Sequence, residues 1–489
     1  MTVADRRVTT AAEGRLAANV EALLATARTR HDRRPLISAT AAVAALDPID
    51  LFAAARSLDL EAALWLQPAA DRSIVGVGRA WAVEPGGPDR FEAAATAWRD
   101  LLADAVTTDP APGTRDGGPR LLGGLGFSSR APAPDDPWAP FGPASLVLPA
   151  FAMVRGVDGA TLTVAAGPDQ IDGLDPKVLA RRWDDVVTRA AGLGASAIDG
   201  VLDVSSGADA LRVIDERPDR IAWERTVGLF AGAVGRGRID KVVLARRVVL
   251  RATGDLDVVA ALRHLARTAP ESTVFAFVRG GTTFLGATPE RLVRTVGRSF
   301  ETVAIAGSAA RGRDAVEDAR FASALLASEK DHEEHAVVVD MLRASLAPIV
   351  ETLVVAGSPA ILPLRHVQHL VTPVTGTTRD EGGLLELAQR LHPTPAVGGA
   401  PRDVALALID EHEGFDRGWY AGPVGWLGAD GDGEMMVALR SGLVAGSEAT
   451  LFAGCGIVAD SDPAREWEES RLKLRTMIAA LGHIDEGEP

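Results

Sequence analysis

Pairs of apolar segments joined by short glycine-containing turns limit the folds that this chain can adopt more than any other feature. Residues 272–285 contain two strand-like segments around Gly280 and Gly281, which is typical of a β-hairpin. Residues 422–440 repeat the pattern around an Asp/Gly turn. Segments with helical periodicity separate such hairpins. Hairpins interleaved with helices favour an α+β fold over a doubly wound parallel sheet.

The remaining segments predict an order of elements and a boundary. Helices are expected at 12–30, 176–194, 221–235, 257–268 and, whole or interrupted, at 314–346, and strands at 121–127, 241–250 and 451–457. The strand at 121–127 is favoured over a phosphate loop because no Lys-Ser/Thr pair follows its glycines. Small and polar residues at 195–209 predict a boundary. We therefore expect an N-terminal α+β portion, 1–205, and a catalytic portion, 206–489, packed into one globule.

Charge and cysteine content exclude several classes of protein. The 489 residues carry a formal net charge of −15, which argues against binding to nucleic acid or to an anionic membrane. No apolar run is long enough for a membrane span, and the first residues lack the apolar stretch of a signal peptide. Cys455 is the only cysteine, so no disulfide forms within the chain. These features predict a cytoplasmic enzyme.

The segment 461–482 predicts a helix that carries a polar site. Asp462 is placed to cap its start and Gly482 to end it. Glu466, Glu469 and Lys473 follow at i, i+3 and i+7, which puts them on one face. Two carboxylates and an ammonium suit a metal ion and an anionic ligand. A solvated surface with ion pairs is the alternative, and this helix alone favours it.

Other segments carry matching chemistry, each with a plain structural alternative. Lys241 begins an apolar strand, so it is either a strand end in water or a buried base. Glu290 lies in a turn, where it is either exposed or, in an apolar pocket, a general acid. Glu334 lies in a stretch dense in ionisable groups, which is either solvated or part of a magnesium site shared with Glu469. Arg440 and Lys473 are natural partners for a carboxylate.

Ten segments, in order along the chain, resemble those of the chorismate-utilising enzymes. The resemblance is close over roughly the last 270 residues and loose before them. The segments are KVVLARRV, GATPERL, IAGSAARG, SEKDHEEH, VQHLVTPVTG, LHPTPAVGGAP, FDRGWYAGPVGW, MVALRSG, FAGCGIV and SDPAREWEESRLK. Within the family they are most similar to the isochorismate synthases, and the N-terminal part resembles the longer menaquinone-pathway form. The resemblance implies large twisted antiparallel β-sheets with helices packed on the outside.

The resemblance also implies a magnesium-dependent, reversible conversion of chorismate to isochorismate, and it implies a role for individual residues. Lys241 activates the water that adds at C2, and Glu290 protonates the C4 hydroxyl that leaves. Glu334 and Glu469 hold Mg²⁺, with Glu466 close by. The positions that match the chorismate site are Gly307, Ser308, His369, Ala396, Tyr420, Arg440, Gly454 and Lys473.

Several alternatives remain open within and outside this family. Anthranilate synthases typically have glutamine at the position of Lys241 and need a glutaminase, for which this chain has no additional cysteine, so no glutaminase subunit is expected. A salicylate synthase, which also eliminates pyruvate, is the nearest rival, together with a siderophore-pathway isochorismate synthase. A non-catalytic chorismate-binding protein is the alternative of another class. The chain is expected to be a monomer or a weak homo-oligomer.

Overall fold

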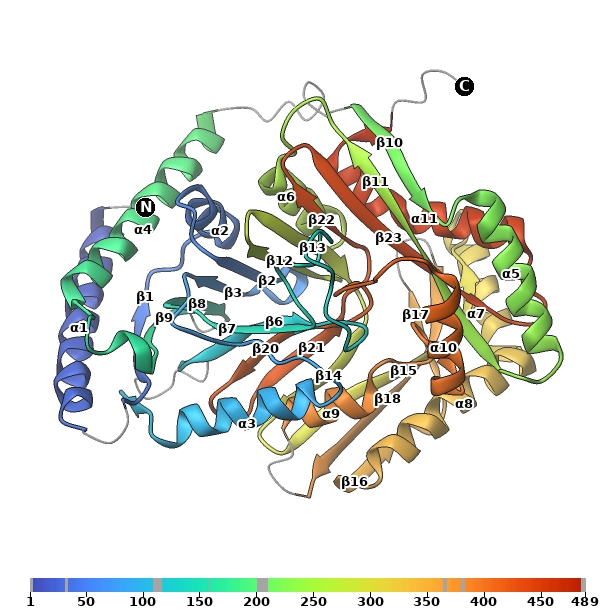
Figure 1. Cartoon of the computed structure of the whole chain (residues 1–489), viewed down its shortest axis with the longest axis horizontal. Coiled ribbons are helices and arrows are strands. Elements are labelled where there is room, and N and C mark those ends of the chain that lie inside the picture. The colour runs from blue at the N-terminus through green and yellow to red at the C-terminus, as the bar shows by residue number, and fades with distance from the viewer. Residues whose placement is uncertain are drawn as a thin grey trace.

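Two large sheets form the centre of the molecule (Figure 1). The structure is a computed structural model, and it describes residues 3–30, 34–108, 117–157, 159–199, 210–363, 367–379 and 383–484. Among these residues every strand pair is antiparallel except β1 with β5 and β10 with β24. The expected α+β class is therefore confirmed.

The first sheet has 14 strands. Its order is β24 (His483–Ile484), β10 (Ala210–Arg217), β11 (Lys241–Arg251), β23 (Glu448–Ile457), β22 (Ser441–Ala445), β13 (Thr282–Thr288), β12 (Thr273–Arg279), β2 (Ala62–Gln67), β3 (Arg72–Val77), β8 (Phe151–Gly156), β9 (Gly159–Ala166), β1 (Ile37–Val43) and β5 (Val106–Thr107), and β19 (Gly399–Ala400) pairs with β11.

The second sheet has ten strands. Its order is β16 (Val350–Val355), β18 (Val367–Thr378), β15 (Ser299–Ala310), β14 (Arg291–Val296), β21 (Gly433–Val437), β20 (Pro423–Gly428), β6 (Arg120–Leu125), β7 (Ala144–Leu148) and β4 (Trp81–Val83), and β17 (Ala360–Pro363) pairs with β18.

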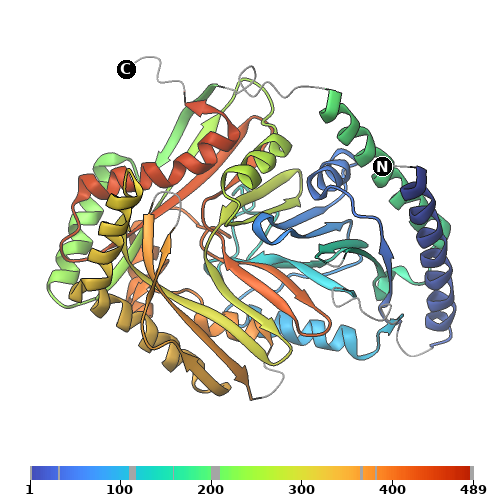
Figure 2. The same cartoon turned by 180° about the vertical axis from the view of Figure 1, so that it is seen from behind.

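Helices cover the outside of the two sheets, as Figures 1 and 2 show from opposite sides. They are α1 (Val3–Arg28), α2 (Pro48–Ser57), α3 (Arg90–Ala103), α4 (Pro176–Asp199), α5 (Arg220–Gly235), α6 (Val258–Thr268), α7 (Ala315–Ala327), α8 (Glu329–Leu346), α9 (Leu384–Leu391), α10 (Arg402–His412) and α11 (Pro463–Leu481). The helices α1 and α4 lie together at one end, whereas α5 and α11 lie side by side at the other.

Local predictions agree with the observed elements. The two expected hairpins are β12–β13 and β20–β21, with Phe277 opposite Phe284 in the first. The expected helix at 314–346 is interrupted at Ser328, whose side chain accepts a hydrogen bond from the backbone N–H of Asp331 and so caps α8. The glycine-rich segment at 121–127 forms the strand β6, as predicted.

Four buried aromatic rings pack into one cluster, formed by Trp138, Phe141, Phe284 and Trp419. The rings of Trp138 and Phe284 are 5.0 Å apart, and those of Phe141 and Trp419 are 5.2 Å apart. Gly418 packs against this cluster with φ +52°, and a Cβ there would lie 2.1 Å from the Trp138 ring. Only glycine fits this position. The buried Trp419 thereby places the next residue, Tyr420.

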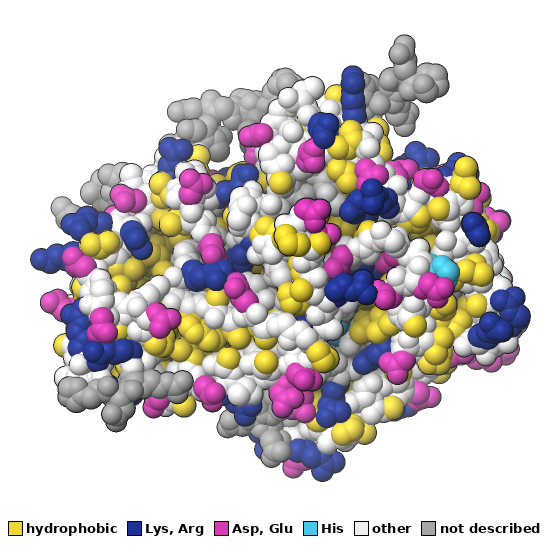
Figure 3. Space-filling view, in the orientation of Figure 1, with side chains coloured by type: hydrophobic (Ala, Val, Ile, Leu, Met, Phe, Trp, Pro, Cys, Tyr) yellow, Lys and Arg dark blue, Asp and Glu magenta, His cyan; other side chains and the backbone are white. Residues whose placement is uncertain are grey.

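Both sheets contain strands from each of the two predicted portions of the chain. In the first sheet β2 pairs with β12, and in the second β6 pairs with β20. Of residues 195–209, where the boundary was expected, 195–199 are the last residues of α4 and 200–209 lie outside the described residues, so the division at residue 205 stays a prediction. On the face in Figure 3, acidic and basic side chains are interspersed with apolar ones.

Candidate active site

The two predicted catalytic residues lie on neighbouring parts of the structure. Lys241 is the first residue of β11, and Glu290 lies in the turn between β13 and β14. The backbone of Glu290 is held on both sides, because its N–H donates to Thr288 Oγ1 at 3.3 Å and its carbonyl accepts from the N–H of Val437 at 2.9 Å. Burial raises the pKa of Glu290 to about 7, against the opposing charges of Lys241 and Lys473. Both ammonium groups therefore act on this carboxyl group.

The side chain of Lys241 packs against a glycine that the sequence analysis did not single out. Gly456 lies on β23, and a Cβ at this position would be 2.6 Å from Cε and 3.3 Å from Nζ of Lys241. Any other residue would displace the lysine stem. The only sequence signal was the glycine itself, within the segment FAGCGIV.

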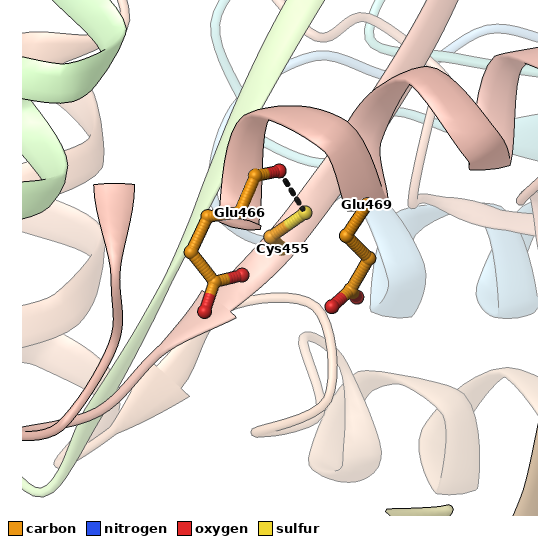
Figure 4. Close-up of side chains that lie close together, drawn as sticks. All are labelled: Cys455, Glu466 and Glu469. Carbon is orange, nitrogen blue, oxygen red and sulfur yellow. Dashed lines mark hydrogen bonds between the residues drawn. The ribbon is translucent and has the colours of Figure 1, made fainter. Parts of the chain in front are cut away.

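Two carboxylates meet at the start of α11 (Figure 4). The carboxylate oxygens of Glu466 and Glu469 and the Sγ of Cys455 lie within 4.8 Å of one another. Ser461 Oγ donates to Glu466 Oε1 at 2.9 Å. The pKa of Glu466 is raised, first by burial and also by the charge of Glu469. A divalent cation would relieve this repulsion, so the pair suits a hard metal ion.

Cys455 does not add a ligand to this pair. Its thiol donates to the backbone carbonyl of Glu466 at 3.3 Å, as Figure 4 shows. Burial raises the pKa of the thiol, and a metal ligand would need the thiolate. Cys455 is therefore a packed neutral residue.

The third predicted metal ligand, Glu334, belongs to α8. Its side chain lies outside the described residues, so its role stays a prediction. The helix itself packs against β15. Near the start of α8, Asp331 Oδ1 would be 3.3 Å from a Cβ on Gly307 of β15. The beginning of this helix is therefore adjacent to the predicted substrate-binding pair Gly307 and Ser308.

Two cations lie along α11, with Lys473 on the same face as Glu469 and Arg440 against Thr476. Lys473 Nζ donates to the carbonyl of Gly454 at 2.7 Å and lies 2.7 Å from Glu469 Oε1. Arg440 has φ +48° and donates from Nη1 to Thr476 Oγ1 at 3.4 Å. Burial lowers the pKa of Arg440, and Tyr420 opposes this effect. Arg440 also lines a cavity of about 220 Å³ that reaches Pro289, the neighbour of Glu290.

Directly after a bulge in the second sheet, Ser308 lies opposite His369. Gly307 has φ +77°, and the register between β15 and β18 shifts there. Ser308 Oγ lies 2.7 Å from His369 Nδ1 in the resulting pair. Burial lowers the pKa of His369 to about 4, so the imidazole is neutral at neutral pH. It can therefore exchange hydrogen bonds with a ligand without adding charge.

Tyr420 and Ala396 complete the predicted set. The ring of Tyr420 stacks on Phe452 at 5.2 Å, and burial raises the pKa of its hydroxyl to about 12. This hydroxyl lies next to Gly454, 3.2 Å from where a Cβ would stand. Ala396 lines a small cavity together with Glu290. Contacts among the described residues thus place each predicted site residue beside at least one other, apart from Glu334.

A buried ion pair, also missed by the sequence analysis, holds the loop at 392–400. Glu413 and Arg417 form a hydrogen-bonded pair inside the molecule. Arg417 donates to the carbonyls of Val397 and Val243, each at 2.8 Å. Glu413 Oε1 accepts from the N–H of Ala245 at 2.7 Å. The pair therefore ties the loop that contains Ala396 to β11. The segment FDRGWYAG contained Arg417, but only the fold reveals what it joins.

The chain is similar to known proteins over almost its full length. A family model described as "Chorismate binding enzyme" matches residues 21–482. The salicylate biosynthesis isochorismate synthase of Pseudomonas aeruginosa is 39% identical over 93% of this chain and 92% of its own. The isochorismate synthase MenF of Bacillus subtilis is 32% identical over 91% and 93%.

A solved structure is also similar to this chain over almost its full length. The menaquinone-specific isochorismate synthase MenF from Escherichia coli superposes with a TM-score of 0.71 and 26% identity, over 95% of this chain and 99% of that one. Among the described helices of the present chain, none is long and apolar enough to cross a membrane.

Proposed function

The chain belongs to the family of chorismate-binding enzymes, and on this premise we propose that Lys241 and Glu290 carry out its reaction. It is an isochorismate synthase, which converts chorismate reversibly to isochorismate. The observation that supports these two roles best is the burial of Glu290, which raises its pKa to about 7 beside two ammonium groups. A carboxyl group of ordinary pKa would be ionised at neutral pH and unable to donate a proton.

The reaction needs one base and one acid. In the forward direction Lys241 takes a proton from water while the water oxygen bonds to ring carbon C2. The double bonds shift, the bond from C4 to its hydroxyl oxygen breaks, and Glu290 gives its proton to the departing group, which leaves as water. Lys241 ends as an ammonium and Glu290 as a carboxylate. In the reverse direction the two residues exchange roles, so one pair serves a reversible reaction.

Glu466 and Glu469 are the described residues that we propose for Mg²⁺, with Glu334 as a further carboxylate. Their oxygen atoms and their spacing within 4.8 Å suit a hard cation. When bound, the ion supplies positive charge for the ring carboxylate of the substrate. Glu469 is half-exposed, which leaves it open to a ligand.

The cations and polar groups around the pair would hold the substrate. Arg440 and Lys473 are proposed for its second carboxylate, since a guanidinium can bind a carboxylate through two hydrogen bonds. The neutral His369 is proposed to orient the ring through a hydrogen bond. Tyr420, stacked on Phe452, provides a rigid wall with a protonated hydroxyl group.

The test is chromatography of chorismate incubated with the purified protein and Mg²⁺ at neutral pH. We expect a mixture of chorismate and isochorismate, with the same ratio reached from either compound. Pyruvate and salicylate formed in equal amounts at an enzyme-dependent rate would instead identify a salicylate synthase. The relatives are named for salicylate biosynthesis and for menaquinone formation. That this chain supplies isochorismate to menaquinone biosynthesis therefore stays a prediction.

A further inference from the structure

A second cavity, of about 510 Å³, opens beside the loop at 392–400. Its wall is formed by α3, α9, α10 and the segments 127–130 and 413–417. His392 and Pro393, at the start of the loop, line this cavity, whereas Ala396 faces the small cavity beside Glu290. A volume of this size is within the range of sites for small molecules, roughly 300–1,000 Å³. None of the predicted catalytic or substrate-binding residues lines it.

Arg90 of α3 lines this cavity, and no carboxylate among the described residues forms an ion pair with it. Its side chain is only 6% exposed, its Nη2 donates to the carbonyl of Gly126 at 2.9 Å, and its Nε has no hydrogen-bond partner among the described residues. Burial lowers the pKa of Arg90 to about 10, and no acidic side chain in the described part of the chain opposes the effect. A buried guanidinium without a counter-ion is costly unless a ligand supplies the charge.

The acidic side chains on the wall are already engaged. Asp410 pairs with Arg130 at 2.5 Å, and Glu413 pairs with Arg417. Asp416 accepts from the backbone N–H of Gly418 at 2.8 Å. A fourth arginine of the wall, Arg402, donates to the carbonyl of Arg390 at 2.8 Å. Arg90 and Arg402 form no ion pair with these carboxylates, and with four arginines against three carboxylates the wall keeps a net positive charge.

His392 adds a polar atom that also lacks a partner. The residue is 6% exposed, and its Nε2 lies 3.1 Å from the carbonyl of Phe127. A carbonyl accepts, so Nε2 carries the hydrogen and Nδ1 is an acceptor. No described residue donates to Nδ1. The ring centroids of Phe127 and Phe91 lie 5.8 Å and 6.2 Å from that of the imidazole.

We propose that this cavity binds a small ring-bearing carboxylate that also carries a hydrogen-bond donor, at a site separate from the reaction site. The carboxylate meets Arg90 and Arg402, because a guanidinium matches the geometry of a carboxylate. The donor meets Nδ1 of His392, which satisfies its orphan acceptor. The ring lies against Phe91, Phe127 and Pro393, which give the cavity its apolar surface.

An occupant of this cavity touches the elements that position the reaction site. Glu413 and Arg417 stand on its wall, and they hold both the loop at Val397 and the strand β11, which begins with Lys241. A ligand that orders this wall changes the freedom of both elements. Its effect on the turnover rate is therefore not relieved by excess chorismate.

The experiment is calorimetric titration of the full chain with 2-hydroxybenzoate as the probe. Arg90→Gln is expected to weaken binding about tenfold or more, since it removes the charge-assisted pair. Arg99→Gln is the matched control, because Arg99 is an exposed arginine on the same helix. Arg440→Gln tests the reaction site and is expected to leave this binding intact.

Three results would overturn the proposal. The first is that the probe does not bind at millimolar concentration. The second is that Arg440→Gln loses binding while Arg90→Gln retains it. The third is that the probe inhibits the reaction and saturating chorismate abolishes the inhibition. Benzoate, which lacks the hydroxyl donor, is expected to bind several-fold more weakly, and equal affinities would remove the role of His392. If Arg90→Gln does not fold, Arg402→Gln replaces it, because Arg402 is only partly buried.

Discussion

Lys473 and Glu469 lie one turn apart on α11 and form an ion pair, with 2.7 Å between Nζ and Oε1. The same carboxylate is proposed for Mg²⁺, and the same ammonium for a carboxylate of the substrate. A cation bound to Glu469 draws that carboxylate away from Lys473 and leaves the ammonium available. The pair therefore links the binding of the metal to that of the substrate.

This link predicts that Mg²⁺ and chorismate strengthen each other's binding by about fivefold or more, a common size for coupling between sites. The measurement is titration of the Lys241→Gln variant, which is expected to be inactive, with chorismate at low and high Mg²⁺. Coupling free energies are reciprocal, so titration with Mg²⁺ should show the same factor. Chorismate affinity independent of Mg²⁺ would contradict the link.

Replacement of the metal carboxylate is expected to abolish the reaction. Glu469→Gln removes a charged oxygen ligand, so activity at ordinary Mg²⁺ should fall by about 100-fold or more while the melting temperature stays near that of the wild type. Glu468→Gln is the control, because Glu468 is its exposed neighbour and pairs with Arg471 at 3.3 Å. Full activity of Glu469→Gln would exclude this residue as a ligand.

Lys241→Gln is expected to lose water addition, since an amide cannot accept the proton. General base catalysis typically contributes 10²–10⁴-fold, so a loss of about this size is expected in the formation of isochorismate. Chromatography of the product measures it, with Lys177→Gln on α4 as a lysine outside the site. Undiminished turnover by the Lys241 variant would show that another group is the base.

The two directions of the reaction are expected to share one pH profile at low substrate concentration. The forward step needs Lys241 neutral and Glu290 protonated, and the reverse step needs the ammonium and the carboxylate, so both competent states hold one proton between the two residues. Because the pKa of Glu290 is about 7, the pair loses one of its two protons as pH rises through 7, and the rates of both directions rise together. Initial rates of both directions between pH 6 and pH 8 measure this, within roughly one unit of the pKa.

Glu290→Gln is the companion variant for that pH series. It should block both directions, because glutamine neither donates nor accepts the proton. Profiles that differ between the two directions at low substrate concentration would contradict a single proton shared by Glu290 and Lys241.

The close contact between Lys241 and Gly456 gives a fifth prediction. In Gly456→Ala the added methyl group would stand 2.6 Å from Cε of Lys241, so the lysine stem must move. We expect about a tenfold loss in kcat, since small displacements of a catalytic group are costly, with a smaller change in KM. Gly235→Ala is a control, because its Cβ would meet no atom closer than 4.0 Å. Wild-type kcat in Gly456→Ala would exclude this positioning role.

Local signals in the sequence predicted local structure well. The hairpin around Gly280 and the helix between Asp462 and Gly482 depend on turn and capping residues next to them in the chain, and both are observed. The face that carries Glu466, Glu469 and Lys473 follows from helical spacing alone. Residue types and order were also enough for the resemblance to a family, which the comparisons support.

Properties that depend on tertiary packing could not be predicted from the sequence alone. The raised pKa of Glu290 results from burial by several elements, and a turn in isolation would have left it exposed. Likewise, Glu413 and Arg417 are near each other in sequence, but their bonds reach Val243 and Val397. The contact of Gly456 with Lys241 joins residues that only the pairing of β11 with β23 brings together.

The pairing of β6 with β20 has a consequence for how the chain is made. Gly124 and Val424 are partners in this pair, and roughly 300 positions separate them, which is a very non-local contact. A ribosome releases the first of these strands long before its partner exists. Until then its hydrogen-bonding edge and apolar side chains are open to other chains, so newly made protein is expected to aggregate easily and to depend on chaperones during synthesis.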